Sequence, residues 1–194
     1  MERSLDHSLR CPLCKQPLQE VGCQFTGCQI LFYNTHARKL EFADYGCLLE
    51  IHSLELLPDG RSFVDAAGCS RFKVLKRGQR DGYHTADIQY LEDLKVDGSE
   101  LEALEHLHDD VYQQAQDWYQ RLGDRVREQI DRQYGAMPDR EGNIQASSNG
   151  PAWCWWLLSV LQLDPAYQTT VLSLDSLKDR LGHLRLVLEY FSQS

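Results

Sequence analysis

The residues of this chain with the clearest chemical potential are its cysteines. Seven are present, and four of them fall within the first 28 residues. Cys11 and Cys14 have a CxxC spacing, which lets two thiolates reach one tetrahedral zinc ion. Candidates for the remaining ligands are Cys23, Cys28, and either His7 or His36. Two interpretations stay open: residues 7–36 bind zinc by themselves, or the pair is a fragment of a larger zinc module.

No catalytic constellation is evident elsewhere in the sequence. Cys47 or Cys69 could pair with His52 or His84 as an activated thiol, but a cysteine on a strand is more often a small core residue. The sequence contains no phosphate-binding loop, no dinucleotide fingerprint, no GxSxG elbow and no HExxH zinc motif. We therefore predict no catalytic residue, and the sequence does not identify a binding surface.

Composition and charge limit the partners that the chain can have. Lys and Arg number 20 against 29 Asp and Glu, a net charge of −9, so the basic footprint of a nucleic-acid-binding protein is missing. No run approaches the ~20 apolar residues of a membrane span, and the N-terminus lacks the apolar block of a signal peptide. An odd cysteine count is typical of a reducing compartment. We expect a protein of the cytoplasm, or of the nucleus, without membrane or nucleic-acid partners.

Hydrophobic patterns predict two kinds of structure that follow one another. Short apolar runs at 47–57, 61–68, 71–76 and 83–91, separated by turn residues, predict an antiparallel meander over residues 46–95. Gly68 and Gly78 are predicted as bulges or corners. From Ser99, which could form a capping box with Glu102, apolar residues recur at helical spacing as far as Ile130, and Gly135 ends the pattern.

The last third of the chain predicts a packed group of helices. A polar loop at 138–150 precedes the run AWCWWLLSVLQL, whose tryptophans we expect in the core. His106 and His108 are predicted at the surface and the core edge. A final helix begins near Asp175, with leucines and Phe191 on its apolar side and Arg180 elsewhere. The fold class is α+β: an antiparallel β meander, then a long helix and a C-terminal helical bundle.

Five blocks of this region resemble a known family, the Lon N-terminal (LON substrate-binding) domain. The blocks are FADYGC at 42–47, LPDGRS at 57–62, RFKVLKRG at 71–78, DGYHTADIQYLED at 81–93 and NGPAWCWWLL at 149–158. The resemblance extends from residue 43 to about 192. It is strongest to the version in the LON peptidase N-terminal domain and RING finger proteins, and it implies an incomplete Lon β half because the family's opening strands are not matched before residue 42.

Residues 2–18, ERSLDHSLRCPLCKQPL, resemble the end of the RING finger of those proteins. This resemblance implies that Cys11 and Cys14 are the last ligand pair of a two-zinc module whose six earlier ligands are absent. The predicted domains are thus a RING remnant at 1–18, an unassigned linker at 19–42 and a Lon N-terminal domain at 43–194 that lacks its first strands. We expect a shortened splice form or a mispredicted gene.

The function implied by the resemblance is a substrate-binding, protein-recognition module of a RING–Lon ubiquitin ligase, non-catalytic in this truncated form. The alternative is a zinc-dependent ubiquitin ligase that acts with a partner chain, which completes the RING and so recruits a ubiquitin-conjugating enzyme. A small-molecule binder is a third interpretation. A meander without its first strands would also present an unpaired edge and a partly uncovered apolar face, which favours self-association or pairing with a partner protein.

Overall fold

The structure, a computed structural model, describes residues 25–34, 39–59, 61–80, 83–161 and 163–192. The chain divides into two compact units, neither of which is continuous in sequence. We call residues 1–91 and 164–173 the sheet unit, and residues 92–163 and 174–194 the helical unit. Across the residues that the structure describes, no helix is both long enough and apolar enough to cross a bilayer.

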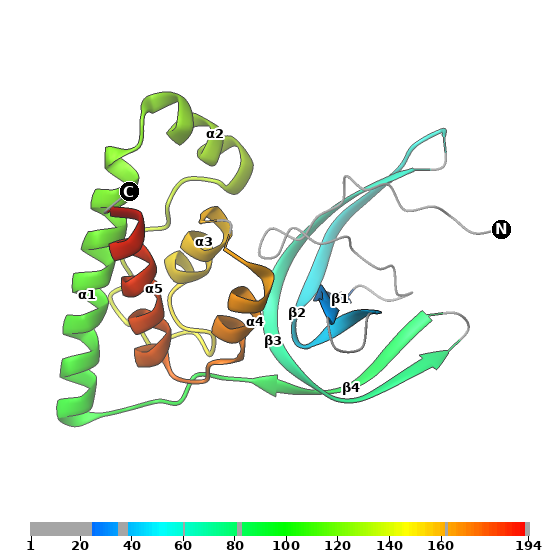
Figure 1. Cartoon of the computed structure of the whole chain (residues 1–194), viewed down its shortest axis with the longest axis horizontal. Helices are drawn as coiled ribbons and strands as arrows, with labels where there is room; N and C mark the ends of the chain where they lie inside the picture. Colours follow the sequence, from blue (N-terminus) through cyan, green and yellow to red (C-terminus); the bar gives the residue numbers. More distant parts are fainter. Residues whose placement is uncertain (1–24, 35–38, 60, 81–82, 162, 193–194) are drawn as a thin grey trace. The chain divides into compact units, whose positions relative to one another are not determined.

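The sheet unit is a four-stranded antiparallel meander, as the sequence predicts (Figure 1). Its strands follow one another in order: β1 (Phe25–Asn34), β2 (Lys39–Leu56), β3 (Ser62–Arg80) and β4 (Tyr83–Leu91). Strands β3 and β4 pair up to Arg80 and Tyr83, the last described residues on either side of their connection. Helix α4 (Pro165–Ser173) packs against β1 and β2.

Period-two burial on β2 builds the core of the sheet unit. Ala43, Cys47 and Leu49 alternate along one face of the strand and are almost fully buried. On α4, Val171 is completely buried. Burial on β2 ends at Leu49, and the side chains from His52 to Leu56 are exposed. The end of the β2–β3 hairpin therefore lies outside this core.

The strands differ from the predicted ones in three respects. Strand β1 and the start of β2 lie within residues 19–42, where the sequence pattern indicates no element, and the domain boundaries at 18 and 42 stay predictions. The runs 61–68 and 71–76 form one strand, because a bulge at Cys69, between the pairs Leu48–Ser70 and Leu49–Gly68, absorbs the irregular pattern. Gly78 is no bulge: it pairs regularly with Thr85, and a Cβ there would lie 2.8 Å from the Thr85 hydroxyl oxygen.

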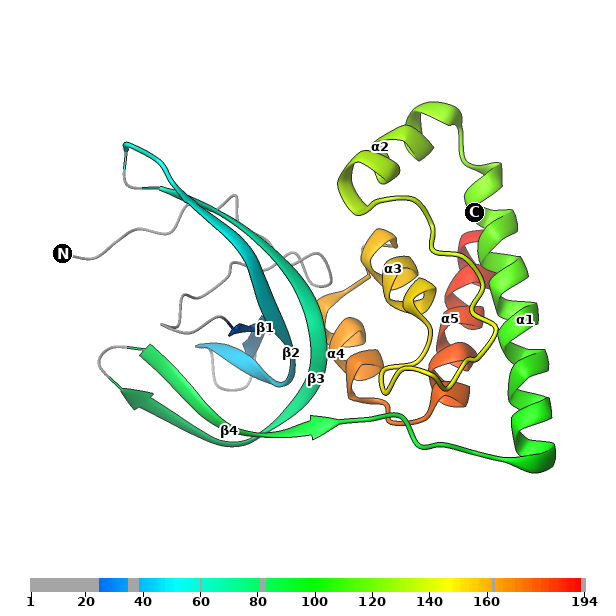
Figure 2. The ribbon, with the colours of Figure 1, turned by 180° about the vertical axis from the view of Figure 1, so that it is seen from behind.

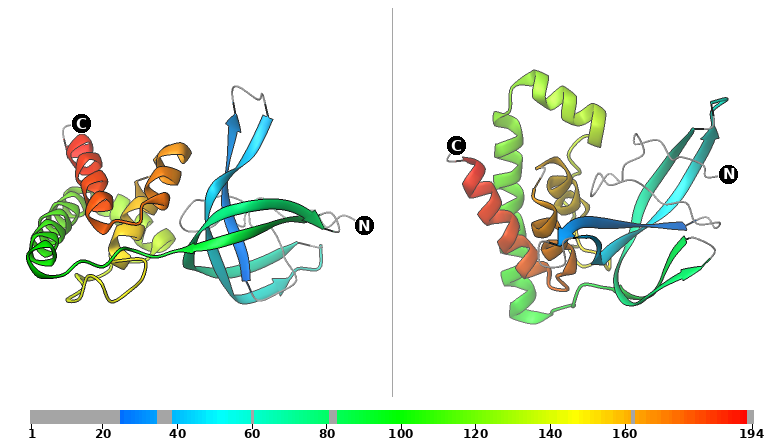
Figure 3. Two further views of the ribbon diagram at one scale, coloured as in Figure 1. Left: turned by 90° about the horizontal axis from the view of Figure 1, so that it is seen from below. Right: turned by 45° about the vertical axis from the view of Figure 1, so that its right-hand side comes forward.

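The helical unit consists of α1 (Gly98–Arg121), α2 (Asp124–Tyr134), α3 (Ala152–Val160) and α5 (Leu177–Ser192). Helices α1 and α5 lie side by side (Figures 2 and 3). Most of α3 is buried, including Trp153 and Trp156, which confirms that this apolar helix belongs to the core. The four leucines predicted on the apolar side of α5, Leu177, Leu181, Leu184 and Leu188, are buried, whereas Phe191 is 39% exposed.

Two predictions for the helices need correction, and one helix has no counterpart in the predicted elements. The predicted helix from 99 to 135 is broken after Arg121, because Leu122 and Gly123 take extended conformations. Its start is not a Ser99–Glu102 capping box: Asp97 is the N-cap residue, and no side chain caps the helix. Helix α4 was not predicted, although Asp164 followed by proline is a helix-start signal, and the Asp164 carboxylate does accept a hydrogen bond from the Ala166 N–H.

Candidate functional site

The end of the β2–β3 hairpin exposes apolar side chains that a folded domain normally covers. Leu54 is 51% exposed and Leu56 is 67% exposed. They share one face of the ribbon with Val64, which pairs directly with Leu54. Phe63, 54% exposed, pairs with Glu55 on the other face. We call Leu54, Leu56, Phe63 and Val64 the hairpin-tip patch.

The second half of β3 is rich in cations, which the register distributes over two faces. Lys73 pairs with Gln89, Lys76 with Asp87 and Arg80 with Tyr83, and these three cations share one face, which we call the cationic face. All three side chains are exposed. The register shift at Leu75, between Val74 and Lys76, keeps Lys73 and Lys76 on the same side although they are three residues apart.

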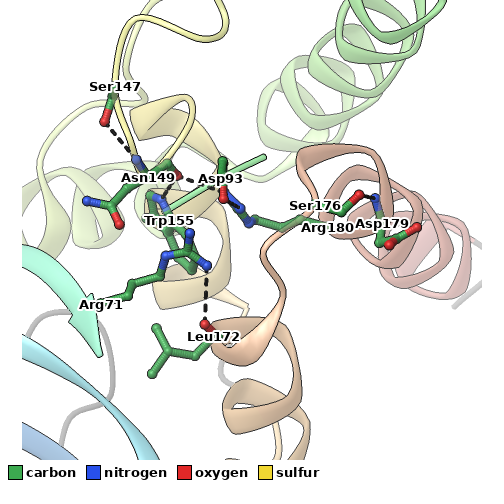
Figure 4. Close-up of polar contacts among 9 residues, drawn as sticks. All are labelled: Arg71, Asp93, Ser147, Asn149, Trp155, Leu172, Ser176, Asp179 and Arg180. Carbon is green, nitrogen blue, oxygen red and sulfur yellow. Dashed lines mark hydrogen bonds and ion pairs between the residues drawn. The ribbon is translucent and has the colours of Figure 1, made fainter. Parts of the chain in front are cut away.

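Two other arginines of β3 have structural partners instead. Arg77 donates hydrogen bonds to the carbonyls of Phe42 and Ala43 and to the Asp44 carboxylate at 2.6 Å. Arg71 is only 2% exposed, and its Nη1 donates to the Leu172 carbonyl at 3.3 Å, which ties α4 to β3 (Figure 4). These two side chains therefore hold the sheet unit together and contribute no exposed charge to the cationic face.

A buried ion pair anchors the helical unit (Figure 4). Arg180 of α5 is fully buried, and both of its terminal nitrogens contact the carboxylate of Asp93, which precedes α1. Arg180 Nη1 also donates to the Asn149 carbonyl at 2.7 Å, and the guanidinium lies 4.5 Å from the centroid of the Trp155 ring. The pair thus connects three segments that are distant in the sequence.

Gly150 completes this arrangement because it leaves room for the ion pair. Its φ of 71° lies in the left-handed region, and a Cβ there would lie 2.7 Å from Asp93 Oδ2 and 3.0 Å from Arg180 Nη1. The backbone N–H of Asp93 donates to the Ser148 carbonyl at 2.7 Å, and that of Leu94 donates to the Asp175 carbonyl at the same distance. Loop, linker and α5 are therefore fixed together around one charge pair.

A second group of hydrogen-bonded side chains lies in the core of the helical unit. His108 is completely buried, which corrects its predicted place at the core edge, whereas His106 is exposed as predicted. His108 Nε2 accepts a hydrogen bond from Trp153 Nε1 at 2.9 Å, and its Nδ1 lies 3.0 Å from the Asp109 carboxylate. Arg140 binds that carboxylate through two nitrogens and lowers the pKa of Asp109 to about 2. Both imidazole nitrogens are occupied, so this histidine is no candidate base.

The metal-binding and thiol candidates named from sequence are placed as follows. Cys11 and Cys14, with His7, Cys23 and His36, lie outside the described residues. Cys28 lies on β1 opposite Cys47. Cys47 is buried, Cys69 is exposed, and the Sγ atoms of both lie within hydrogen-bonding distance of the Leu48 carbonyl. Within the described part of the chain, no three His, Cys, Asp or Glu side chains gather as a metal site.

Sequence reasoning missed the burial of Arg180 and the exposure of the hairpin tip. Arg180 lies three residues after Leu177 and four before Leu184, which are both buried, so it occupies the apolar stripe of α5. That position was the available signal for a buried cation. At the β2–β3 hairpin, the alternation of apolar and polar residues predicts that one face of the strands is buried. It does not show how far along the strands that burial extends.

Comparisons with known proteins agree with this architecture. The model of the ATP-dependent protease La (LON) substrate-binding domain matches residues 27–189, so the chain belongs to this family. The match begins before residue 43, where the sequence resemblance was first placed, and includes most of β1.

Two solved structures match this chain. The N-terminal domain of the Mycobacterium avium complex Lon protease matches with a TM-score of 0.51 and 13% identity, covering 83% of this chain and 77% of that one. The Lon N-terminal domain protein from Xanthomonas campestris matches with a TM-score of 0.44 and 15% identity over 94% and 95% of the two chains. At this identity the first likeness shows the fold alone.

Proposed function

We propose that this chain is a non-catalytic module that recognises polypeptides, and that the hairpin-tip patch makes the contact. The observation that carries the proposal is the exposure of Leu54, Leu56 and Phe63 on a paired ribbon, in a member of a substrate-binding family. Exposed apolar groups on a hydrogen-bonded scaffold can bind other apolar surfaces with little loss of conformational entropy. In the helical unit, the Asp93–Arg180 pair and the buried His108 have internal partners and serve the architecture.

The test uses a polypeptide that cannot fold, reduced and carboxymethylated α-lactalbumin, labelled for fluorescence anisotropy. Burying a leucine side chain contributes about 1.5–3 kcal/mol, and a partly buried contact contributes about half of that. The two leucines together should contribute about 1.5–3 kcal/mol, so we expect the double variant Leu54→Ser/Leu56→Ser to bind roughly 10- to 150-fold more weakly than the native chain, since 1.4 kcal/mol corresponds to a factor of ten.

The matched control is Leu186→Ser, because Leu186 is 62% exposed but lies on α5. This variant should bind like the native protein. Equal losses in the control and in the double variant, or no binding by the native chain, would contradict the proposal.

We further propose that this module derives from a RING–Lon ubiquitin ligase, on the resemblance of residues 2–18 to the end of a RING finger. Cys11 and Cys14 would then supply the last zinc ligands of the RING, and two thiolates alone do not close a structural zinc site. The purified chain should contain no stoichiometric zinc and should show no autoubiquitination. One or two zinc ions per assembly, with zinc-dependent ligase activity, would favour the alternative in which a partner chain completes the RING.

A further inference from the structure

The β2–β3 hairpin extends beyond the strands that neighbour it in the sheet (Figure 1). The pairing of β1 with β2 reaches only Glu50, and the pairing of β4 with β3 reaches only Arg71. Within the described part of the chain, residues 51–56 and 62–70 therefore pair only with each other. Side chains on both faces at the end of this ribbon are exposed, so each face can meet a partner.

On the face opposite to Leu54 and Leu56, an aromatic ring adjoins two carboxylates. Phe63, which is 54% exposed, pairs directly with Glu55, and Asp65 follows Phe63 two residues later on the same strand. Residues that pair directly, and residues two apart on a strand, lie on one face. Both acidic side chains are exposed. We call Phe63, Glu55 and Asp65 the aromatic–acidic face.

The two carboxylates of this face have no counter-ion in the described part of the chain. No hydrogen bond or ion pair there involves the side chain of Glu55 or Asp65. Residues 50–67 contain four acidic residues and a single arginine, Arg61. That arginine binds Asp59: its Nε donates to Oδ2 at 2.7 Å, and its backbone N–H donates to Oδ1 at 3.1 Å. Negative charge without an internal partner thus lies beside an exposed ring.

We propose that the aromatic–acidic face binds a lysine or arginine side chain of the polypeptide that the hairpin tip recognises. This inference rests on the proposed function and deepens it, because it selects polypeptides in which basic residues lie among apolar ones. The aliphatic stem of such a side chain can pack on the ring of Phe63, with its cationic group near a carboxylate. The spacing permits both contacts, since directly opposite Cβ atoms are about 4.5–5.5 Å apart and residues two apart on a strand are about 6.6 Å apart.

The neighbours of the ring select the sign of the charge. An acidic side chain over Phe63 would meet like charge from Glu55 and Asp65, and also the negative face of the ring itself. A cation gains attraction from all three groups and relieves the repulsion between the two carboxylates. Because these groups are exposed, the preference for a cation should decrease as salt is added.

Two labelled peptides of equal apolar content test the inference on the full chain: acetyl-(Lys-Leu)3-amide and acetyl-(Glu-Leu)3-amide. We expect the Lys-Leu peptide to bind at least about fivefold more tightly in 50 mM salt, and to lose this advantage as the salt is raised. Glu55→Gln/Asp65→Asn should bind it roughly 2- to 30-fold more weakly, because each exposed ion pair contributes a factor of about 1.4–5. Phe63→Leu keeps an apolar side chain but removes the ring, and should bind it roughly 2- to 5-fold more weakly.

The matched control is Asp110→Asn/Glu189→Gln, which removes the same charge from exposed positions on α1 and α5. This variant should bind the Lys-Leu peptide like the native chain. Equal losses in the two double variants would assign the preference to the net charge of −9 and would overturn the inference. Circular dichroism melting shows that each variant is folded.

Proton NMR supplies a second measurement. The ring of Phe63 should move the methylene signals of a bound lysine upfield, and Phe63→Leu should abolish that shift. Equal binding of the two peptides, or lysine signals that do not move, would each overturn the inference. Binding of unfolded α-lactalbumin through Leu54 and Leu56 tests the proposed function separately, so its retention alongside equal peptide binding would leave that function intact.

Discussion

Removal of the Asp93 carboxylate should be among the most damaging single changes in the helical unit. Asp93→Ala leaves the guanidinium of Arg180 buried beside the Asn149 carbonyl and the Trp155 ring, without its counter-ion. Arg180 Nε has no hydrogen-bond partner in the described structure, so the terminal nitrogens make the hydrogen bonds of this guanidinium, and the variant removes those to Asp93. Removing one partner of a buried ion pair costs about 3–5 kcal/mol. At roughly 2–4 °C per kcal/mol for a protein of this size, the melting temperature should decrease by about 6–20 °C.

Urea unfolding followed by tryptophan fluorescence measures this loss where it occurs, because all four tryptophans lie in the helical unit. The matched control is Asp59→Ala, which breaks a solvent-exposed pair with Arg61 at 2.7 Å and should change the stability little. The double variant Asp93→Leu/Arg180→Met removes both charges and should recover much of the stability. Equal losses of stability for Asp93→Ala and Asp59→Ala would refute this reasoning. If the double variant were less stable than Asp93→Ala, the stability lost would come from packing and not from the unpaired charge.

Three more changes have definite expected outcomes. Gly150→Ala should destabilise the protein by about 1–3 kcal/mol in urea unfolding, from backbone strain and from overlap with the ion pair; a neutral effect would contradict the close approach. Arg140 lowers the pKa of Asp109 from 3.8 to about 2, so the stability that this carboxylate contributes is present above about pH 4 and is lost as the pH decreases toward 2. Unfolding midpoints of Asp109→Asn should show a shallower decrease over that range, and an unchanged slope would count against the Arg140 contact. Iodoacetamide should alkylate the exposed Cys69 before the buried Cys154, whose pKa is raised by burial, and peptide mass spectrometry showing equal rates would contradict that burial.

The spacing of apolar residues along the sequence predicted most of the fold, because a half-buried strand repeats every two residues and a half-buried helix about every 3.6. Alternation along β2 and β4 and the apolar run of α3 correspond to elements of the structure. The break between α1 and α2 was not predictable from the spacing of apolar residues, since Leu122 continues the helical spacing while its backbone is extended. Strand β1 was missed because residues 19–42 show no sustained period, and its pairing with β2 is a tertiary effect.

The candidate site was harder to predict than the fold. Exposure of Leu54 and Leu56 depends on burial along β2 ending at Leu49, and no local pattern contains that information. The cationic face depends on the register shift at Leu75, without which Lys73 and Lys76 would lie on opposite faces. The absence of catalytic residues stays a prediction, whereas the family match supports a substrate-binding domain.

The interrupted course of the chain has a practical consequence for dissecting this protein. Helix α4 packs on the sheet, yet it is encoded between α3 and α5, which both belong to the helical unit. A fragment that stops at residue 91 would lack Val171 and the Leu172 carbonyl to which Arg71 donates. The middle of β2 would then be exposed to solvent. Excising residues 164–173 from the remainder would in turn demand a new linker. Truncation analysis would therefore confuse misfolding with lost recognition, whereas point substitutions in the intact polypeptide keep the two apart.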